Sequence, residues 1–209
     1  MHSTLAALIA FIPAAILLTI TPGLDTALVL RTAATEGPRK GALAGLGIAL
    51  GCLIWAALVA VGLGALLAAS ALAYTILRWV GAAYLVWMGY RMLRHPRQAF
   101  VLETARGGKA SATFVRGALT NLLNPKVGVF YVSFLPQFVP HGAPVAPFVM
   151  LLGAIHVGVG LVWVACLIAA TRPISRWLRR PRVVRNLDRV TGGLFVAFGL
   201  ALAADFRRA

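Results

Sequence analysis

The sequence predicts an all-α integral membrane protein with six transmembrane helices, built as two inverted repeats of three helices each. The chain of 209 residues is 60% apolar and 12% charged, and its mean hydropathy is +0.87. So apolar a chain excludes a soluble nucleic-acid-binding protein, although its formal charge is +15. A helix needs ~20 residues to cross a bilayer, and the sequence contains six apolar runs of about that length or longer. The runs cover 5–30, 41 to about 68, about 72 to 90, 113–139, 144–171 and 188–204.

Basic residues lie on alternate connections between these runs and predict the orientation of the chain. Sixteen of the 20 Lys and Arg residues fall on three connections, those between runs one and two, three and four, and five and six, if Arg116 and Arg189 in the first residues of runs four and six are included. The connections around 65–75 and 138–145 contain none. By the positive-inside rule the basic connections face the cytoplasm, so both termini are expected outside. The same charge favours contact with anionic membrane lipids.

A weak internal repeat supports the inverted arrangement. Gly45-Leu46-Gly47-Ile48 in the second run matches Gly153-Ala154-Ile155-His156 in the fifth. In the same alignment Thr21-Pro22 of the first run falls opposite Asn124-Pro125 of the fourth. A repeat with three crossings must be inverted in the membrane, because an odd number of crossings reverses the second copy.

The repeats divide the chain into three parts that together form one membrane domain. We expect a first repeat over 1–93, a cytoplasmic linker over 94–112 and a second repeat over 113–209. No Lys or Arg precedes the first apolar run, and that run is longer than the apolar part of a signal peptide. The first run is therefore expected to be a retained transmembrane helix.

The stretch Thr21-Pro22-Gly23-Leu24-Asp25-Thr26 breaks three rules of a membrane helix. Pro22 cannot donate a backbone hydrogen bond and clashes with the carbonyl of Leu18, and Gly23 is a poor helix former. An ionised aspartate near the bilayer centre costs roughly 2.5–3.5 kcal/mol. Because threonine is a good N-cap and proline is favoured at the first helical position, we predict that a second half-helix starts here.

Asn124-Pro125 repeats this chemistry in the fourth run. The two breaks would leave the carbonyls of Leu18 and Asn121 without helical partners, and the two new half-helices would converge on one central volume. Lys126 lies in a first helical turn, where the helix dipole opposes its charge, so it needs an anionic neighbour. Asp25 and a substrate carboxylate are the candidates. The predicted substrate-binding residues are Thr21, Pro22, Gly23, Asp25, Asn121, Asn124, Pro125 and Lys126.

Several alternatives remain open. Asp25 and Lys126 could be a purely structural ion pair, although ionisable residues inside a membrane usually mark a substrate or ion path. His156 could relay protons or only hydrogen-bond a neighbouring helix. The G-x-x-x-G spacings of the second run indicate close helix packing and would allow a homodimer. Cys52 and Cys166 belong to no ligand cluster, so neither a metal nor another cofactor is expected.

These motifs resemble the LysE/RhtB family of amino-acid exporters. The resemblance rests on Thr21–Thr26, the glycine-rich second run and Asn124-Pro125-Lys126 followed by Phe130-Tyr131 and 134–138, and it covers essentially the whole chain. Leu24 departs from the family, which often has a second proline there, and implies a less rigid break. The resemblance implies export of amino acids or their derivatives across the bacterial inner membrane, driven by a gradient of H⁺ or Na⁺. Both termini would then be periplasmic.

We therefore expect a secondary active exporter of amino acids or related small zwitterionic metabolites, working by alternating access around a midplane site. Lys126 and the half-helix N-termini would hold the substrate carboxylate, while Asp25 and the freed carbonyls would hold its ammonium. We expect a transporter and no enzyme, and we expect no ATP hydrolysis by this chain, since Gly108-Lys109 lacks the rest of a P-loop. The alternatives are an ion channel or ion transporter that uses Asp25 alone, and an intramembrane enzyme, which would need more acids, or Ser and His, near a membrane face.

Overall fold

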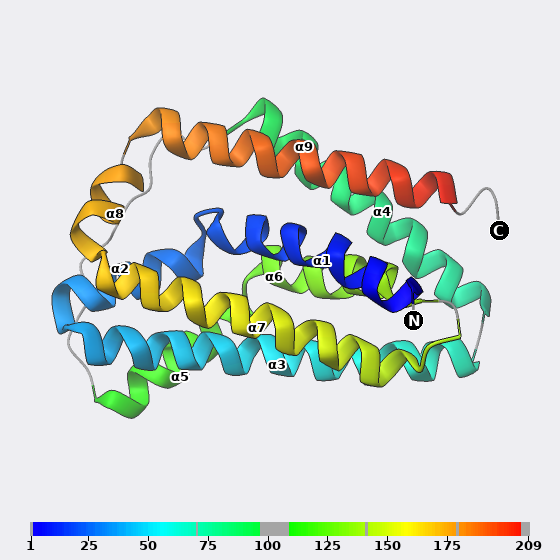
Figure 1. The fold of residues 1–209 in the computed structure, drawn as a ribbon, viewed down its shortest axis with the longest axis horizontal. Coiled ribbons are helices and arrows are strands. Elements are labelled where there is room, and N and C mark those ends of the chain that lie inside the picture. Colours follow the sequence, from blue (N-terminus) through cyan, green and yellow to red (C-terminus); the bar gives the residue numbers. More distant parts are fainter. Residues whose placement is uncertain (1, 70, 97–108, 141, 179, 206–209) are drawn as a thin grey trace.

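A computed structural model (Figure 1) describes residues 2–69, 71–96, 109–140, 142–178 and 180–205, and this part of the chain is almost wholly helical. The α-helices are α1 (His2–Ile20), α2 (Leu24–Glu36), α3 (Pro38–Ala69), α4 (Ala71–Arg94), α5 (Ala110–Leu122), α6 (Pro125–Val129), α7 (Val145–Ala169), α8 (Thr171–Leu178) and α9 (Pro181–Asp205). Between α6 and α7 the chain forms a π-helix, η1 (Phe130–Phe134), and a 3₁₀-helix, η2 (Leu135–Phe138).

The helices follow the predicted apolar runs, with the first and fourth runs divided. The first run forms α1 and α2, and the fourth forms α5, α6, η1 and η2. The turn predicted near residues 68–72 is confirmed, since α3 ends at Ala69 and α4 begins at Ala71. The linker predicted over 94–112 falls mostly on residues outside the described part, and α5 already begins at Ala110.

Two helices of the described chain are long and apolar enough to cross a membrane by themselves. They are the part of α3 over Pro38–Gly62 and α7 over Val145–Ala169. Thr4–Ile20 and Leu24–Glu36 would add a third span if this pair, bent by 53°, is one broken crossing. The first turns of α9 carry several charged residues, which lowers the hydropathy of that helix. Six crossings therefore stay a prediction.

The helices pack as two groups with α1 between them (Figure 1). In one group α3 packs along α5 and α7, and in the other α4 packs along α9. Aromatic rings fill the core next to α1: Phe11 meets Phe138 edge-to-face, and Phe130 stacks on Phe134. All four rings are buried, so the broken first and fourth runs share one apolar core.

Glycines allow α3 to approach its neighbours closely. A Cβ atom on Gly47 would lie 2.0 Å from the carbonyl oxygen of Phe114 in α5, and one on Gly117 would lie 2.2 Å from the carbonyl oxygen of Ala44. Both distances are far inside van der Waals contact, so the backbones of α3 and α5 touch. The close packing predicted for the glycines of the second run is confirmed, and it takes place inside the chain. A homodimer stays a prediction.

The two ends of the molecule differ in the connections that they carry. Helix α1 begins and α9 ends at one end, on the right of Figure 1. The α2–α3 connection, helix α8 and the start of α5 lie at the opposite end. Arg39, Lys40, Lys109 and Arg176 belong to these latter segments. The predicted cytoplasmic connections thus gather at one end of the molecule.

Candidate functional site

The first predicted break is present, but its cap differs from the prediction. Helix α1 ends at Ile20 and α2 begins at Leu24. The N-cap is Gly23, whose backbone is extended (φ −154°), and no side chain caps the helix. The expectation that Thr21 caps a helix starting at Pro22 is therefore wrong. The first N–H groups of α2 are left without a side-chain partner at their cap.

Thr21 finishes α1 instead of starting α2. Its hydroxyl donates to the carbonyl of Leu17 at 2.7 Å and shares a second hydrogen bond with the hydroxyl of Thr191 in α9. Thr21 and Thr191 are both buried. The N-cap position falls on Gly23, so Thr21 lies before the first turn of α2. The contact joins the broken helix to the α4–α9 group.

The second break matches its prediction more closely. Helix α6 begins at Pro125, and the Oδ1 atom of the N-cap Asn124 accepts from the backbone N–H of Lys126 at 3.1 Å. The carbonyl of Asn121, which was predicted to be free, accepts from the backbone N–H of Asn124 at 3.0 Å. Helix α6 lasts only five residues before the chain widens into a π-helix, so its dipole is short.

Lys126 reaches across the cavity to the first break. Its Nζ atom lies 2.9 Å from the carbonyl oxygen of Leu18 and 2.9 Å from that of Thr21. The carbonyl of Leu18 lost its helical donor because Pro22 has no N–H. A cation at the C-terminal end of α1 is favoured by the helix dipole. Main-chain carbonyls thus partner this lysine, a third possibility beside Asp25 and a substrate carboxylate.

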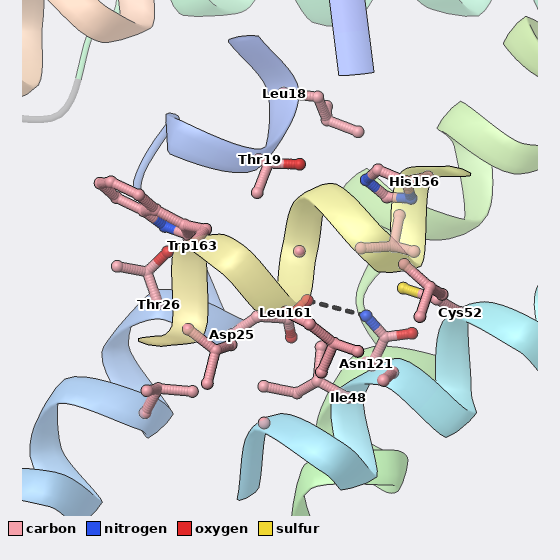
Figure 2. Close-up of a pocket in the computed structure, with 18 of the residues that line it drawn as sticks. Leu18, Thr19, Asp25, Thr26, Ile48, Cys52, Asn121, His156, Leu161 and Trp163 are labelled. Atoms are coloured by element: carbon pink, nitrogen blue, oxygen red, sulfur yellow. Dashed lines mark hydrogen bonds between the residues drawn. The ribbon is translucent and has the colours of Figure 1, made fainter. Parts of the chain in front are cut away.

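Asp25 lies in the first turn of α2, close to Asn121 of α5 (Figure 2). The Nδ2 atom of Asn121 donates to Oδ2 of Asp25 at 2.8 Å. The other carboxyl oxygen, Oδ1, is buried and has no hydrogen-bond partner among the described residues. Buried polar atoms in proteins are nearly always hydrogen-bonded, so an unpartnered one calls for a specific explanation. A ligand that donates to Asp25 supplies one.

A cavity of about 80 Å³ opens between the two breaks, with room for several water molecules. Of the predicted residues it is lined by Thr21, Gly23, Asp25, Asn121, Asn124 and Lys126. Pro22 is not among its described lining residues, and it acts through the course of the backbone. Asp25 supplies a carboxyl group and Lys126 an ammonium group to its described walls. Most of the remaining wall is apolar and comes from α3 and α7.

Two polar residues of α7 that the sequence analysis did not place in the site, His156 and Trp163, belong to this wall. His156 lines the cavity and is buried, and its Nδ1 atom shares a 2.9 Å hydrogen bond with the hydroxyl of Tyr131. The structural bond weighed for His156 is thus present. Trp163 also lines the cavity. A histidine inside an apolar run can be noticed in the sequence as a candidate. For Trp163 the sequence carries no such sign, because it does not show which face of the helix would line the cavity.

The site has the chemistry of a binding site for a small charged solute. It offers an unpartnered carboxyl oxygen, an ammonium group and an apolar wall in one small volume. The described residues contain no group of three or more His, Cys, Asp or Glu that could hold a metal ion. A solute with both a positive and a negative group would find a partner for each.

Comparisons with known proteins agree with this chemistry. The family model described as LysE type translocator matches residues 16–205. The homoserine/homoserine lactone efflux protein of Salmonella typhimurium (strain LT2) is 32% identical over 195 residues, which cover 93% of this chain and 95% of that protein. The leucine efflux protein of Enterobacter sp. (strain 638) is 30% identical over 198 residues, 93% of both chains. The threonine efflux protein of Escherichia coli (strain K12) is 31% identical over 195 residues, which cover 88% of this chain and 90% of that protein.

No solved structure matches the chain. The chain is a membrane protein that belongs to the LysE type translocator family.

Proposed function

We propose that this protein is a secondary active exporter of amino acids or related small zwitterionic metabolites across the bacterial inner membrane. The observation that carries the proposal is the cavity at the helix breaks, where Asp25 and Lys126 line one small volume. Charges are buried in an apolar surrounding only when they are paired, so a zwitterion suits this cavity. The relatives named as homoserine, leucine and threonine efflux proteins support an α-amino acid as the solute.

Substrate binding would change the partners of Lys126: its ammonium group would leave two carbonyls and bind the substrate carboxylate. The substrate carboxylate binds Lys126 and the uncapped N–H groups at the start of α2, where the helix dipole also favours an anion. The substrate ammonium donates to Oδ1 of Asp25 and to the carbonyls of Leu18 and Thr21 that Lys126 leaves. In the bound state Lys126, Asp25 and the two carbonyl groups would thus each have a partner on the substrate.

Alternating access follows from the proposed architecture of six helices in two inverted repeats. Two contacts support it: α3 packs along α7 and α4 packs along α9, and each pair consists of corresponding helices of the repeats. Ile48 and His156, which correspond in the repeat alignment, both line the cavity. Rocking of the α4–α9 group against the group of α3, α5 and α7 would open the cavity to each side in turn.

A gradient of H⁺ or Na⁺ would drive export, and Asp25 would carry the coupling charge. Its unpartnered oxygen can take up a proton or help to bind Na⁺, and both reactions compete with the substrate ammonium. The two ions are separated by measuring uptake into everted vesicles under a pH gradient and under a sodium gradient. Stimulation by neither gradient would contradict ion coupling.

Counterflow in proteoliposomes, with a panel of amino acids, tests the function. Asp25→Asn and Lys126→Met are each expected to reduce exchange at least tenfold while the protein remains folded. Lys109→Met is the matched control, because it removes an exposed lysine far from the cavity. Normal exchange by both site variants would refute the site. A panel that gives no exchange would favour an ion channel, an ion transporter or an intramembrane enzyme.

The orientation has its own test. We propose that α8 and the α2–α3 connection face the cytoplasm and that both termini are periplasmic, as the charges predict. Pro144 and Arg180 are exposed at the two ends of the α7–α8 segment. In a background with Cys52→Ala and Cys166→Ala, Pro144→Cys is expected to react with an impermeant maleimide in intact cells. Arg180→Cys should react only after permeabilisation, and the reverse pattern would invert the topology.

A further inference from the structure

We propose that the part of the cavity walled by α3 and α7 receives the substrate's side chain, and that the indole N–H of Trp163 binds an oxygen atom on that side chain. The inference rests on the proposed function and narrows its substrate class. The preferred substrates are amino acids whose side chain is uncharged and carries an oxygen acceptor, such as a hydroxyl group.

This part of the wall disfavours substrates with a charged side chain. Asp25 and Lys126 are occupied by the ammonium and carboxylate groups that every amino acid carries. Beyond them the part of the wall that comes from α3 and α7 is mostly apolar, with residues such as Ile48 and Leu161 (Figure 2), and its polar side chain His156 is hydrogen-bonded to Tyr131. A second charge on the substrate would be buried there without a partner, which is strongly disfavoured.

Trp163 adds a second polar side chain to the α7 part of the wall, beside His156, whose Nδ1 atom is bonded to Tyr131. Its Nε1 atom is buried and has no hydrogen-bond partner among the described residues. The ring packs against the cluster of Val29, Leu30, Leu167 and Val184, which holds it in place. Because an indole N–H can only donate, its missing partner must be an acceptor. An oxygen on the substrate's side chain would satisfy a donor that otherwise pays the full desolvation penalty.

Gly160 provides the room for this contact. It lines the cavity on the same face of α7, three residues before Trp163, and a Cβ atom added there would meet no atom within 4 Å. Residues three and four apart on a helix are neighbours on one face. The hollow left by Gly160 therefore lies next to the turn that carries the indole, where a substrate side chain can enter.

Threonine and valine test the contact, because they differ mainly in a hydroxyl in place of a methyl group. At subsaturating concentrations we expect the wild-type protein in proteoliposomes to exchange threonine at least tenfold faster than valine. A site that hydrogen-bonds a hydroxyl discriminates strongly against an analogue without it. Trp163→Phe keeps the ring and removes the N–H, so the ratio should fall close to one while valine exchange persists.

Trp55→Phe is the matched control. Trp55 also has a buried Nε1 atom without a described partner, but it does not line this cavity. Its loss should leave the threonine-to-valine ratio unchanged. A wild-type protein without preference for threonine would overturn the inference, as would a Trp163→Phe ratio equal to that of the wild type. Absence of exchange with every amino acid would instead refute the proposed function.

Discussion

Asn121 holds Asp25 across the site, with its Nδ2 atom 2.8 Å from Oδ2 of the carboxyl group. The two residues are 96 positions apart in sequence and belong to the two runs that are broken. Asn121 is completely buried. The hydrogen bond therefore fixes one carboxyl oxygen, while the other has no hydrogen-bond partner among the described residues. Asn121 thus positions the acid on which the proposed ammonium site depends.

Asn121→Leu is expected to reduce transport at least tenfold and to lower the free energy of unfolding by about 1–3 kcal/mol. Leucine has nearly the same shape, so the main change is that a buried carboxyl oxygen loses its donor. Counterflow and thermal unfolding of the purified protein measure the two effects. Asn186→Leu, at an exposed position of α9, serves as the control. Transport equal to that of the wild type would show that Asp25 does not depend on Asn121.

Gly51 makes room for this asparagine, and Gly51→Ala should disturb it. The new Cβ atom would lie 2.7 Å from Oδ1 of Asn121 and 3.1 Å from the carbonyl oxygen of Ala118. Such crowding typically costs about 1–3 kcal/mol of stability. We expect slower transport together with a lower melting temperature.

Gly62→Ala is the matched variant for Gly51. It adds the same methyl group to the same helix α3, at a position where no atom lies within 4 Å. Transport and stability should remain at or slightly above the wild-type level, because alanine favours a helix by about 1 kcal/mol over glycine. An equal loss of transport in both variants would point to helix flexibility in place of the contact with Asn121.

Gly160→Leu is expected to narrow the range of substrates. The added side chain enters open space, so the protein should fold normally while the cavity loses volume next to Trp163. Discrimination against larger amino acids should rise by about 10–200-fold, the usual effect of one methylene in a tight pocket. Gly158→Leu, also without atoms within 4 Å but outside the cavity lining, should keep the wild-type range. Competition assays with amino acids of graded size measure the difference.

The hydroxyl contact between Thr21 and Thr191 should appear as an energetic coupling. Thr21→Val removes this partner from the buried hydroxyl of Thr191, at about 1–3 kcal/mol of unfolding free energy, whereas Thr191→Val leaves the hydroxyl of Thr21 bonded to the carbonyl of Leu17 and should cost less. The double variant should lose less than the sum of the two, since neighbouring residues are not additive. Chemical unfolding in detergent measures all three. Strict additivity would show that the contact contributes nothing to stability.

The positions of the breaks could be predicted from sequence because they depend on local chemistry. Proline removes a backbone donor wherever it stands, and a short run containing Pro22, Gly23 and Asp25 cannot continue an apolar helix. The same reasoning found Asn124 as the cap of α6 and brought Asp25 and Lys126 to one cavity. These conclusions need only the residue types and their order.

The partners of these residues could not be predicted, because tertiary contacts select them. Thr21 was expected to cap a helix, but its hydroxyl shares a hydrogen bond with that of Thr191, 170 positions away. Lys126 was expected to have Asp25 or a substrate carboxylate as its neighbour, and the two carbonyls at the end of α1 that accept its hydrogen bonds were not foreseen as its partners. Trp163 gave no signal, since an apolar run that is hydrophobic on all sides does not reveal which face meets the cavity.

The reach of Lys126 to the carbonyls of Leu18 and Thr21 gives the empty carrier a built-in competitor. A tethered ammonium group has a high effective concentration at the place where the amine of a free solute must bind. Under the proposed function, a solute would displace it only when the concentration of that solute is high. The protein would then export little solute at ordinary metabolite concentrations and would export it rapidly only when the solute accumulates.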